Sequence, residues 1–179
     1  MKNSRLALTA LVTTLAAACA TATASMANAS DEGVTGTTAD RITLAHVRDI
    51  TAKYKDVSVA LADGYLPTTD CVASPDGGMG LHYVNPGLLD TLDPDHPPVL
   101  LYSANSSRPT LMGAEWFHAD ADQDLSTDQD RPSLFGHAFQ GPMLGHEPGM
   151  PIHYDLHVWA WRANPAGDFS PWNPAVHCG

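Results

Sequence analysis

The feature that most constrains the fold is a stretch near the C-terminal end, residues 152–161, in which the side chains alternate in character. Pro148-Gly149 and Pro151 precede it and are typical of a turn. Such alternation predicts a β-strand, in which side chains two residues apart share a face. One face would carry apolar residues suited to a core: Tyr154, Leu156, Val158 and Ala160. The other would carry two histidines, an aspartate and two tryptophans: His153, Asp155, His157, Trp159 and Trp161.

The polar face of this strand favours a binding site for a transition-metal ion. Aspartate is depleted in strand interiors and exposed indole rings are unusual, so a plain solvent-facing surface explains the row poorly. Imidazole and carboxylate groups are ligands for zinc, copper, iron and manganese, and we expect copper or zinc here. The alternative interpretation is a half-buried strand that shows His153, Asp155 and His157 to water.

Strand geometry limits how many of these residues can bind one ion. Residues i and i+2 of a strand lie about 6.6 Å apart at Cα, which places His153 and His157 about 13 Å apart. We therefore expect two of His153, Asp155 and His157 to bind the ion. Side chains from elsewhere would complete the set: His82, Glu115 and His146. His82 lies in a short predicted strand, residues 81–84, where a hydrogen-bonded core histidine is the alternative.

Glu115 is expected to lie on one strand of a hairpin. Residues 99–104 and 110–118 flank a turn-forming segment and predict two paired strands. One face of the second strand would carry Leu111, Gly113, Glu115 and Phe117, and the other Met112, Ala114, Trp116 and His118. A lone buried carboxylate is costly, so Glu115 should have a partner or line a pocket.

Glu147 raises the question of catalysis. It adjoins His146 in a loop rich in Gly and Pro, so it could point away from the ion and act as a general base. No P-loop, G-x-S-x-G, dinucleotide or H-E-x-x-H motif accompanies it. The sequence therefore leaves open whether the site is catalytic.

The tryptophans support a hypothesis from a different class, a module that binds a small molecule such as a sugar without a metal. Trp116, Trp159 and Trp161 would grip that molecule together with the histidine row. Analysis of the bound metal would separate this hypothesis from the first one.

The first 29 residues have the pattern of a signal peptide, so we expect a secreted or otherwise extracytoplasmic protein. Lys2 and Arg5 precede an apolar, Ala-rich run, and Ala27-Asn28-Ala29 is a cleavage motif. The run is too short and too rich in Ala and Thr for a good membrane span. A lipoprotein anchored through Cys19 is the alternative, but the three alanines before Cys19 match a lipobox poorly.

The mature chain would be acidic and would retain one pair of cysteines. Of the 9 Lys and Arg residues, two lie in the signal peptide, which leaves 7 against 20 Asp and Glu, a formal charge of −13. This charge disfavours nucleic acid and anionic membranes as partners and leaves a metal ion or a small molecule. Cys71 and Cys178 remain, and an even pair in an exported protein predicts a disulfide bond.

Composition predicts one domain after a short flexible segment. Residues 30–39 are rich in Gly, Thr and Asp and are expected to be flexible, whereas residues 40–179 are long enough for one domain with a core. We expect the α+β class, with one N-terminal helix packed on a mostly antiparallel sheet or a small open β-barrel and with long loops.

The helix is predicted from an apolar stripe at spacings of three and four: Val47, Ile50, Tyr54, Val57 and Leu61. Thr38 or Asp40 would cap its start, and Gly64 would follow its end. Asp49 and Lys53 would form an ion pair on its exposed side.

Residues 120–126 resemble the start of an EF-hand calcium loop. The resemblance fails at two positions, because Leu125 replaces the glycine at the sixth place and Arg131 replaces the closing glutamate. The pattern therefore predicts an ordinary solvated acidic loop.

Three segments resemble a family of small exported bacterial proteins known mainly as hypothetical sequences. They are residues 77–86, with the motif Gly-Gly-Met-Gly-Leu-His-Tyr-Val-Asn-Pro, residues 145–161 and residues 172–178, and the similarity covers about residues 42–178. The resemblance implies a shared domain and export, and it implies no activity or mechanism.

Overall fold

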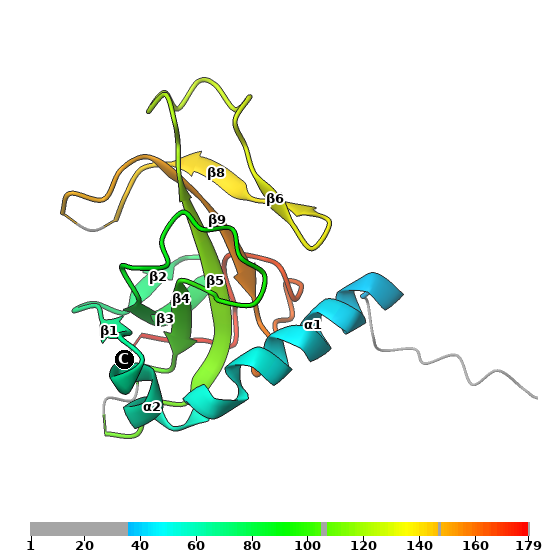
Figure 1. The fold of residues 1–179 in the computed structure, drawn as a ribbon, viewed down its shortest axis with the longest axis vertical. Helices are drawn as coiled ribbons and strands as arrows, with labels where there is room; N and C mark the ends of the chain where they lie inside the picture. Colours follow the sequence, from blue (N-terminus) through cyan, green and yellow to red (C-terminus); the bar gives the residue numbers. More distant parts are fainter. Residues whose placement is uncertain (1–35, 105–106, 147, 179) are drawn as a thin grey trace, which may run out of the picture. The chain divides into compact units, whose positions relative to one another are not determined.

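The structure, a computed structural model, describes residues 36–104, 107–146 and 148–178. In these residues an N-terminal helical segment lies beside a seven-stranded antiparallel sheet of order β1-β3-β4-β5-β9-β8, with β2 paired to β3 (Figure 1). The strands of the sheet are β1 (Leu66–Pro67), β2 (Val72–Ser74), β3 (Gly77–Val84), β4 (Val99–Tyr102), β5 (Leu111–Ala119), β8 (Gln140–Met143) and β9 (His153–Val158). A separate ribbon pairs β6 (Ser133–Leu134) with β7 (His137–Ala138). The predicted α+β class is confirmed, and the sheet is open.

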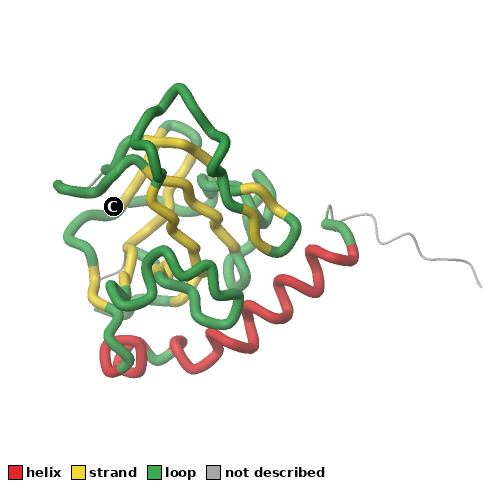
Figure 2. The backbone as a smooth tube through the Cα atoms, turned by 45° about the horizontal axis from the view of Figure 1, so that its top comes forward, coloured by secondary structure: helices red, strands yellow, loops and turns green. Residues whose placement is uncertain are grey.

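Helix α1 (Thr38–Thr51) begins at a capping box. The Thr37 hydroxyl accepts a hydrogen bond from the Asp40 N–H at 3.1 Å, and the Asp40 carboxylate accepts one from the Thr37 N–H at 2.7 Å. These reciprocal bonds satisfy N–H groups that have no partner within the helix. The cap is therefore Thr37, one residue before the Thr38 that the sequence suggested. Figure 2 shows the helical segment lying along one side of the strands.

The predicted single helix is interrupted, and the interruption changes which residues of its last turns face the core. Helix α1 continues into a 3₁₀ turn, η1 (Ala52–Lys55), and α2 (Val57–Ala62) restarts after Asp56, whose carboxylate accepts the Ser58 N–H. The restart shifts the phase of the helix, so Leu61 is 46% exposed and does not continue the apolar stripe.

The interruption also changes the expected ion pair. Lys53 lies in the 3₁₀ turn and pairs with Asp63 at 2.6 Å, so the predicted pair with Asp49 is wrong. Gly64 follows α2 as predicted, with φ at +92° and its N–H donating to the Leu61 carbonyl. Glycine adopts this left-handed conformation without steric cost, which makes it a favourable residue after a helix.

The central strands of the sheet are buried on both faces. The face toward α1 is packed by aromatic and aliphatic side chains: Leu100, Tyr102, Ala114, Trp116, Tyr154, Leu156 and Val158. The opposite face carries a smaller apolar cluster: Val99, Leu101, Met112, Trp159 and Val176. The pairing of β5 with β9 sets Glu115 opposite His157 and Phe117 opposite Asp155. The predicted hairpin is confirmed, and the pairing gives Glu115 and His157 one shared face.

The alternation fails at the far ends of two strands. A register shift in the β4–β5 pairing places Leu111 on the α1 side and Met112 on the opposite side, the reverse of the prediction. Strand β9 ends at Val158, so Trp161 leaves the histidine row. The Trp161 indole N–H instead donates to the Thr51 hydroxyl at 3.0 Å, on the α1 side.

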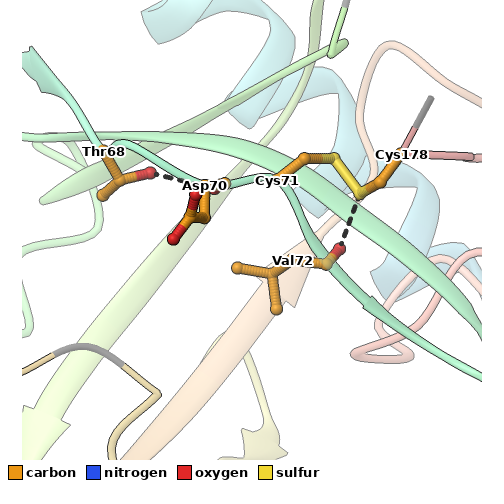
Figure 3. Close-up of a disulfide and its surroundings, with 5 residues drawn as sticks. All are labelled: Thr68, Asp70, Cys71, Val72 and Cys178. Carbon is orange, nitrogen blue, oxygen red and sulfur yellow. Dashed lines mark hydrogen bonds between the residues drawn. A yellow bond between two sulfur atoms is a disulfide. The ribbon is translucent and has the colours of Figure 1, made fainter.

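The predicted disulfide between Cys71 and Cys178 is confirmed, with a Cα–Cα distance of 5.6 Å (Figure 3). The Cys178 sulfur lies 3.3 Å from the Val72 carbonyl oxygen. Gly78 and Asn173 exchange two backbone hydrogen bonds of 3.1 Å, which hold the same C-terminal segment against β3. The disulfide bond is consistent with an oxidising, extracytoplasmic compartment.

No helix in the described part of the chain combines the length and the apolar character needed to cross a bilayer. The predicted signal peptide, residues 1–29, lies outside the described residues. Its cleavage, and the start of the segment predicted at residues 30–39, therefore stay predictions, whereas Thr38 and Ala39 at the end of that segment already belong to α1.

Gly80 on β3 occupies a position where a side chain is not expected to fit. Its φ is +90°, and a Cβ atom there would overlap the Tyr102 carbonyl oxygen. Gly80→Ala is expected to lower the free energy of unfolding by about 3 kcal/mol, because it adds both backbone strain and a clash. Chemical denaturation would measure this loss. The control is Gly136→Ala, which shares a positive φ of +82° but has open space around it and should lose only about 1 kcal/mol. Equal losses in the two variants would contradict the argument from crowding.

Candidate metal centre

Three strands bring two histidines and one glutamate together on the sheet face that points away from α1. His82 comes from β3, Glu115 from β5 and His157 from β9. One ligand atom from each of the three residues lies within 4.8 Å of the others. The Glu115 Oε2 atom lies 3.1 Å from His82 Nε2 and 3.4 Å from His157 Nε2. The three side chains could therefore hold one metal ion.

The register of the sheet explains this convergence. Glu115 lies directly opposite His157 in the β5–β9 pairing and opposite Val99 in the β4–β5 pairing. His82 lies opposite Leu101, two residues along β4 from Val99. His82 therefore reaches Glu115 diagonally across β4, over the apolar side chains of that strand.

The three residues are almost completely removed from water. His82, Glu115 and His157 are 4%, 2% and 0% exposed. Burial lowers the pKa of His157 to about 4, so its imidazole is neutral at pH 7. Burial opposes ionisation of Glu115, but the charge of His82 and a hydrogen bond from it outweigh that effect and lower the pKa of Glu115. Neutral His157 and ionised Glu115 are in the protonation states that bind a metal, and binding of the ion would displace a proton from His82.

The unsatisfied ring nitrogens of His157 are a second indication that the centre binds a metal ion. Neither of its ring nitrogens makes a hydrogen bond within the described residues. A buried polar atom without a partner costs about 1–3 kcal/mol, so native proteins rarely leave one unsatisfied. A metal ion at this point would satisfy one of the two nitrogens and would recover part of that cost.

His153 and Asp155 form a separate pair beside the three residues. The His153 Nδ1–H donates to the Pro151 carbonyl at 3.0 Å, and Nε2 lies 3.3 Å from Asp155 Oδ2. Burial lowers the pKa of His153, but its contacts with Asp155 outweigh this and raise it. Burial and the neighbouring Glu115 raise the pKa of Asp155. The pair is therefore arranged to share a proton next to the three candidate ligands.

The group of three is smaller than the expected ligand set. The sequence suggested two ligands from the row on β9, but only His157 joins His82 and Glu115. The cause is the β5 register: Ala119 lies opposite His153, whereas a carboxylate lies opposite His157. The His153 ring stacks on Phe117 at a centroid distance of 4.9 Å instead.

His146 lies beside the centre without belonging to the group of three. Its ring centroid is 5.7 Å from that of His82 and 6.2 Å from that of His153. Burial and the nearby His82 lower its pKa. Glu147, the expected base, lies outside the described residues, so its role stays a prediction.

A cavity of about 510 Å³ opens beside the centre. Its polar lining includes His82, Glu115 and His146. Most of the remaining lining is apolar: Val84, Leu89, Val99, Phe117, Ala119, Pro148, Met150 and Pro151. The sequence analysis did not predict these apolar walls. Alternation along the strand could have identified Val84 as a wall residue, because it lies two residues after His82 and shares its face. A small molecule in this cavity would have access to the candidate ligands.

Of the three tryptophans expected to join the histidine row in a sugar-binding module, only Trp159 stays on that side of the sheet. Trp116 is fully buried on the α1 side, and Trp161 also packs on that side. Trp159 is 1% exposed and belongs to the opposite apolar cluster, where its ring stacks with His157 at 6.3 Å. None of the three lines the cavity. Trp159 and Trp161 instead line another cavity, of about 490 Å³, together with Arg41, Arg48 and Asp168. The prediction that all three tryptophans share the histidine face was wrong, whereas a small-molecule site at Trp159 and Trp161 stays a prediction.

Comparisons with protein-family models, with curated proteins and with solved structures each found no match. The resemblance to small exported bacterial proteins therefore stays a prediction. What can be concluded about the centre comes from its geometry, which defines a buried His/Glu cluster compatible with a metal ion.

Proposed function

We propose that this protein is an exported metal-binding protein that holds one zinc or copper ion through His82, Glu115 and His157. The observation that carries the proposal is the convergence of three buried ligand atoms within 4.8 Å. Two imidazoles and one glutamate form the ligand set of several catalytic zinc sites, and imidazole also suits copper. The disulfide supports the expectation of an oxidising compartment.

The proposed site is an open one. Zinc in a closed structural site has four protein ligands, whereas three protein ligands leave a position for water or a substrate. The cavity reaches His82 and Glu115 and would give a small molecule access to that position. A metal ion in such a place lowers the pKa of bound water or polarises a bound oxygen. His153 and Asp155 would hold a proton nearby.

The cavity walls favour one kind of small molecule over another. Besides His82, Glu115 and His146, the polar lining includes Thr68 and Asp90, and the remaining walls are largely aliphatic and aromatic. Such a cavity suits a largely apolar molecule with one polar group directed at the ion. We propose binding of such a molecule as a second role, which replaces the sugar in the earlier hypothesis.

Metal titration tests the proposal. Protein purified from its native compartment would be analysed for bound elements, then stripped with a chelator and titrated with Zn²⁺ and with Cu²⁺. We expect one ion per chain with a dissociation constant below about 1 µM for at least one metal. His96→Ala is the control, because that ring is exposed and pairs with Asp93, whereas the residues of the centre are buried. Absence of stoichiometric binding by a folded protein would refute the proposal.

A further inference from the structure

The acidic loop after β5 is a second place where the structure departs from an ordinary surface. Five aspartates fall within residues 120–130: Asp120, Asp122, Asp124, Asp128 and Asp130. The sequence predicted a solvated loop. Asp120 is instead only 2% exposed, and neither of its carboxylate oxygens has a hydrogen-bond partner within the described residues. A buried carboxylate without a partner is strongly unfavourable, so Asp120 requires an explanation.

A second carboxylate is held firmly beside Asp120. The Oδ2 atom of Asp130 accepts a hydrogen bond from the N–H of Ala121, the residue after Asp120, at 2.7 Å. The Oδ1 atom of Asp130 accepts one from the Tyr154 hydroxyl at 2.9 Å. The Asp130 carboxylate also interacts with its own backbone N–H and with the Asp120 carboxyl group. The two carboxyl groups interact directly, and Asp130 is fixed by donors whereas Asp120 has only a backbone contact from Asp124.

No basic side chain in the described residues neutralises this pair. Arg131, the nearest in sequence, directs one nitrogen to Asp128 at 3.1 Å and another to the Phe139 carbonyl at 2.7 Å. Burial and the adjacent Asp130 raise the pKa of Asp120, whereas donated hydrogen bonds lower that of Asp130. The missing positive charge must come from a proton or from a cation.

We propose that Asp120 and Asp130 bind a hard divalent cation, Ca²⁺, at the start of β9. Hard cations take oxygen ligands, and the pair offers carboxylate oxygens with neither imidazole nor thiolate among the described groups that contact it. The site is separate from the His/Glu centre, since His157 and Glu115 pair at the opposite end of the β5–β9 ladder from Ala119 and His153. It does not have the EF-hand pattern, and water would complete the coordination.

The contacts of the loop show what the cation would stabilise. Gln123 joins the loop to Ile152, donating to its carbonyl at 2.9 Å and accepting its N–H at 2.9 Å. The Asp120 N–H donates to the same Ile152 carbonyl at 2.9 Å. Tyr154 on β9 adds the bond to Asp130. Calcium would therefore fix the loop to the first residues of the strand that carries the histidine row.

Calcium titration of the chelator-treated mature chain tests the proposal. We expect one Ca²⁺ with a dissociation constant of about 0.1–1 mM, the range of extracellular modules, because only two carboxylates contribute. About 10 mM Ca²⁺ should raise the melting temperature by about 5 °C. Asp120→Asn should abolish both effects. Asp76→Asn, which removes the same charge from an exposed turn, should keep them. His157→Ala should also keep them, which separates this site from the proposed metal centre.

Asp120→Asn is the decisive variant because it removes the charge and keeps the shape of the Asp120 side chain, and an amide can still interact with Asp130 and with the Asp124 backbone. Asp130→Asn also changes the contacts with Ala121 and Tyr154, so its failure to fold would be uninformative by itself. Terbium luminescence, sensitised by Tyr154 and lost in Asp120→Asn, would support the site independently. If the wild-type chain shows no response to calcium, or Asp120→Asn responds equally, the two carboxyl groups share a proton and the proposal is overturned.

Discussion

Replacing His157 with alanine is expected to lower the affinity for Zn²⁺ or Cu²⁺ by at least about 100-fold. His157 supplies one of the three converging ligand atoms and is fully buried, so no water-exposed residue can take its place. Loss of a residue that only supports a ligand already costs 10–100-fold in affinity, and loss of the ligand itself should cost more. Competition with a chromophoric chelator would measure the change.

The fold is expected to survive this substitution. The His157 ring nitrogens make no hydrogen bond among the described residues, so alanine removes unsatisfied polar atoms as well as packing. Far-ultraviolet circular dichroism would check the fold, and His96→Ala would serve as the matched control with unchanged affinity. Glu115→Gln, which keeps the side-chain shape, provides a second test if the alanine variant is unstable. Wild-type affinity in both variants would place the ion elsewhere.

Removing the disulfide is expected to lower the free energy of unfolding by about 4–5 kcal/mol, because it closes a loop with a sequence separation of 107 residues. The reduced unfolded chain regains the conformational freedom that this loop removes. The paired substitution Cys71→Ala with Cys178→Ala should therefore shift the urea midpoint strongly to lower concentration. The expected loss is comparable with the whole stability of many small domains.

The control for the disulfide is the unaltered chain measured with and without a reducing agent. Reduction should reproduce the shift of the double variant in the wild type and should have no effect on the variant. Amide exchange should rise first at Gly78 and Asn173, whose paired hydrogen bonds hold the C-terminal segment to β3. Equal midpoints in oxidised and reduced protein would contradict the expected stabilisation.

Alternation in the sequence was sufficient to group Glu115 with Phe117 in one strand and His157 with His153 and Asp155 in another, but not to show that the two groups share a face of the sheet. Both residues lie in strands where apolar and polar residues alternate, and a period of two allows only one assignment of faces. The disulfide was also predictable, because only two cysteines remain after residue 29. These features depend on local pattern or on counting, and neither requires knowledge of which strands pair.

Strand register could not be obtained in this way. The sequence contains no indication that His157 lies opposite Glu115 while His153 lies opposite Ala119, and this difference decides which histidine joins the centre. The cavity wall formed by Val99 depends on another pairing, that of β4 with β5. Burial of Asp120 was missed for a related reason, since it arises where the loop folds back onto Ile152, a tertiary contact.

The covalent ring closed by Cys71 and Cys178 contains every strand that contributes to the proposed metal centre. His82, Glu115 and His157 are far apart in sequence, so the centre exists only once β3, β4, β5 and β9 have paired. Such distant strand pairings form slowly, because the chain loses the conformational entropy of long loops before the stabilising contacts between the strands are made. The disulfide-closed loop reduces this entropy loss, because it already restricts the distances between His82, Glu115 and His157 in the unfolded chain. An ion that binds only the assembled sheet would stabilise the folded state after folding is complete. At a free-ion concentration one hundred times the dissociation constant, it would raise the free energy of unfolding by about 2.7 kcal/mol.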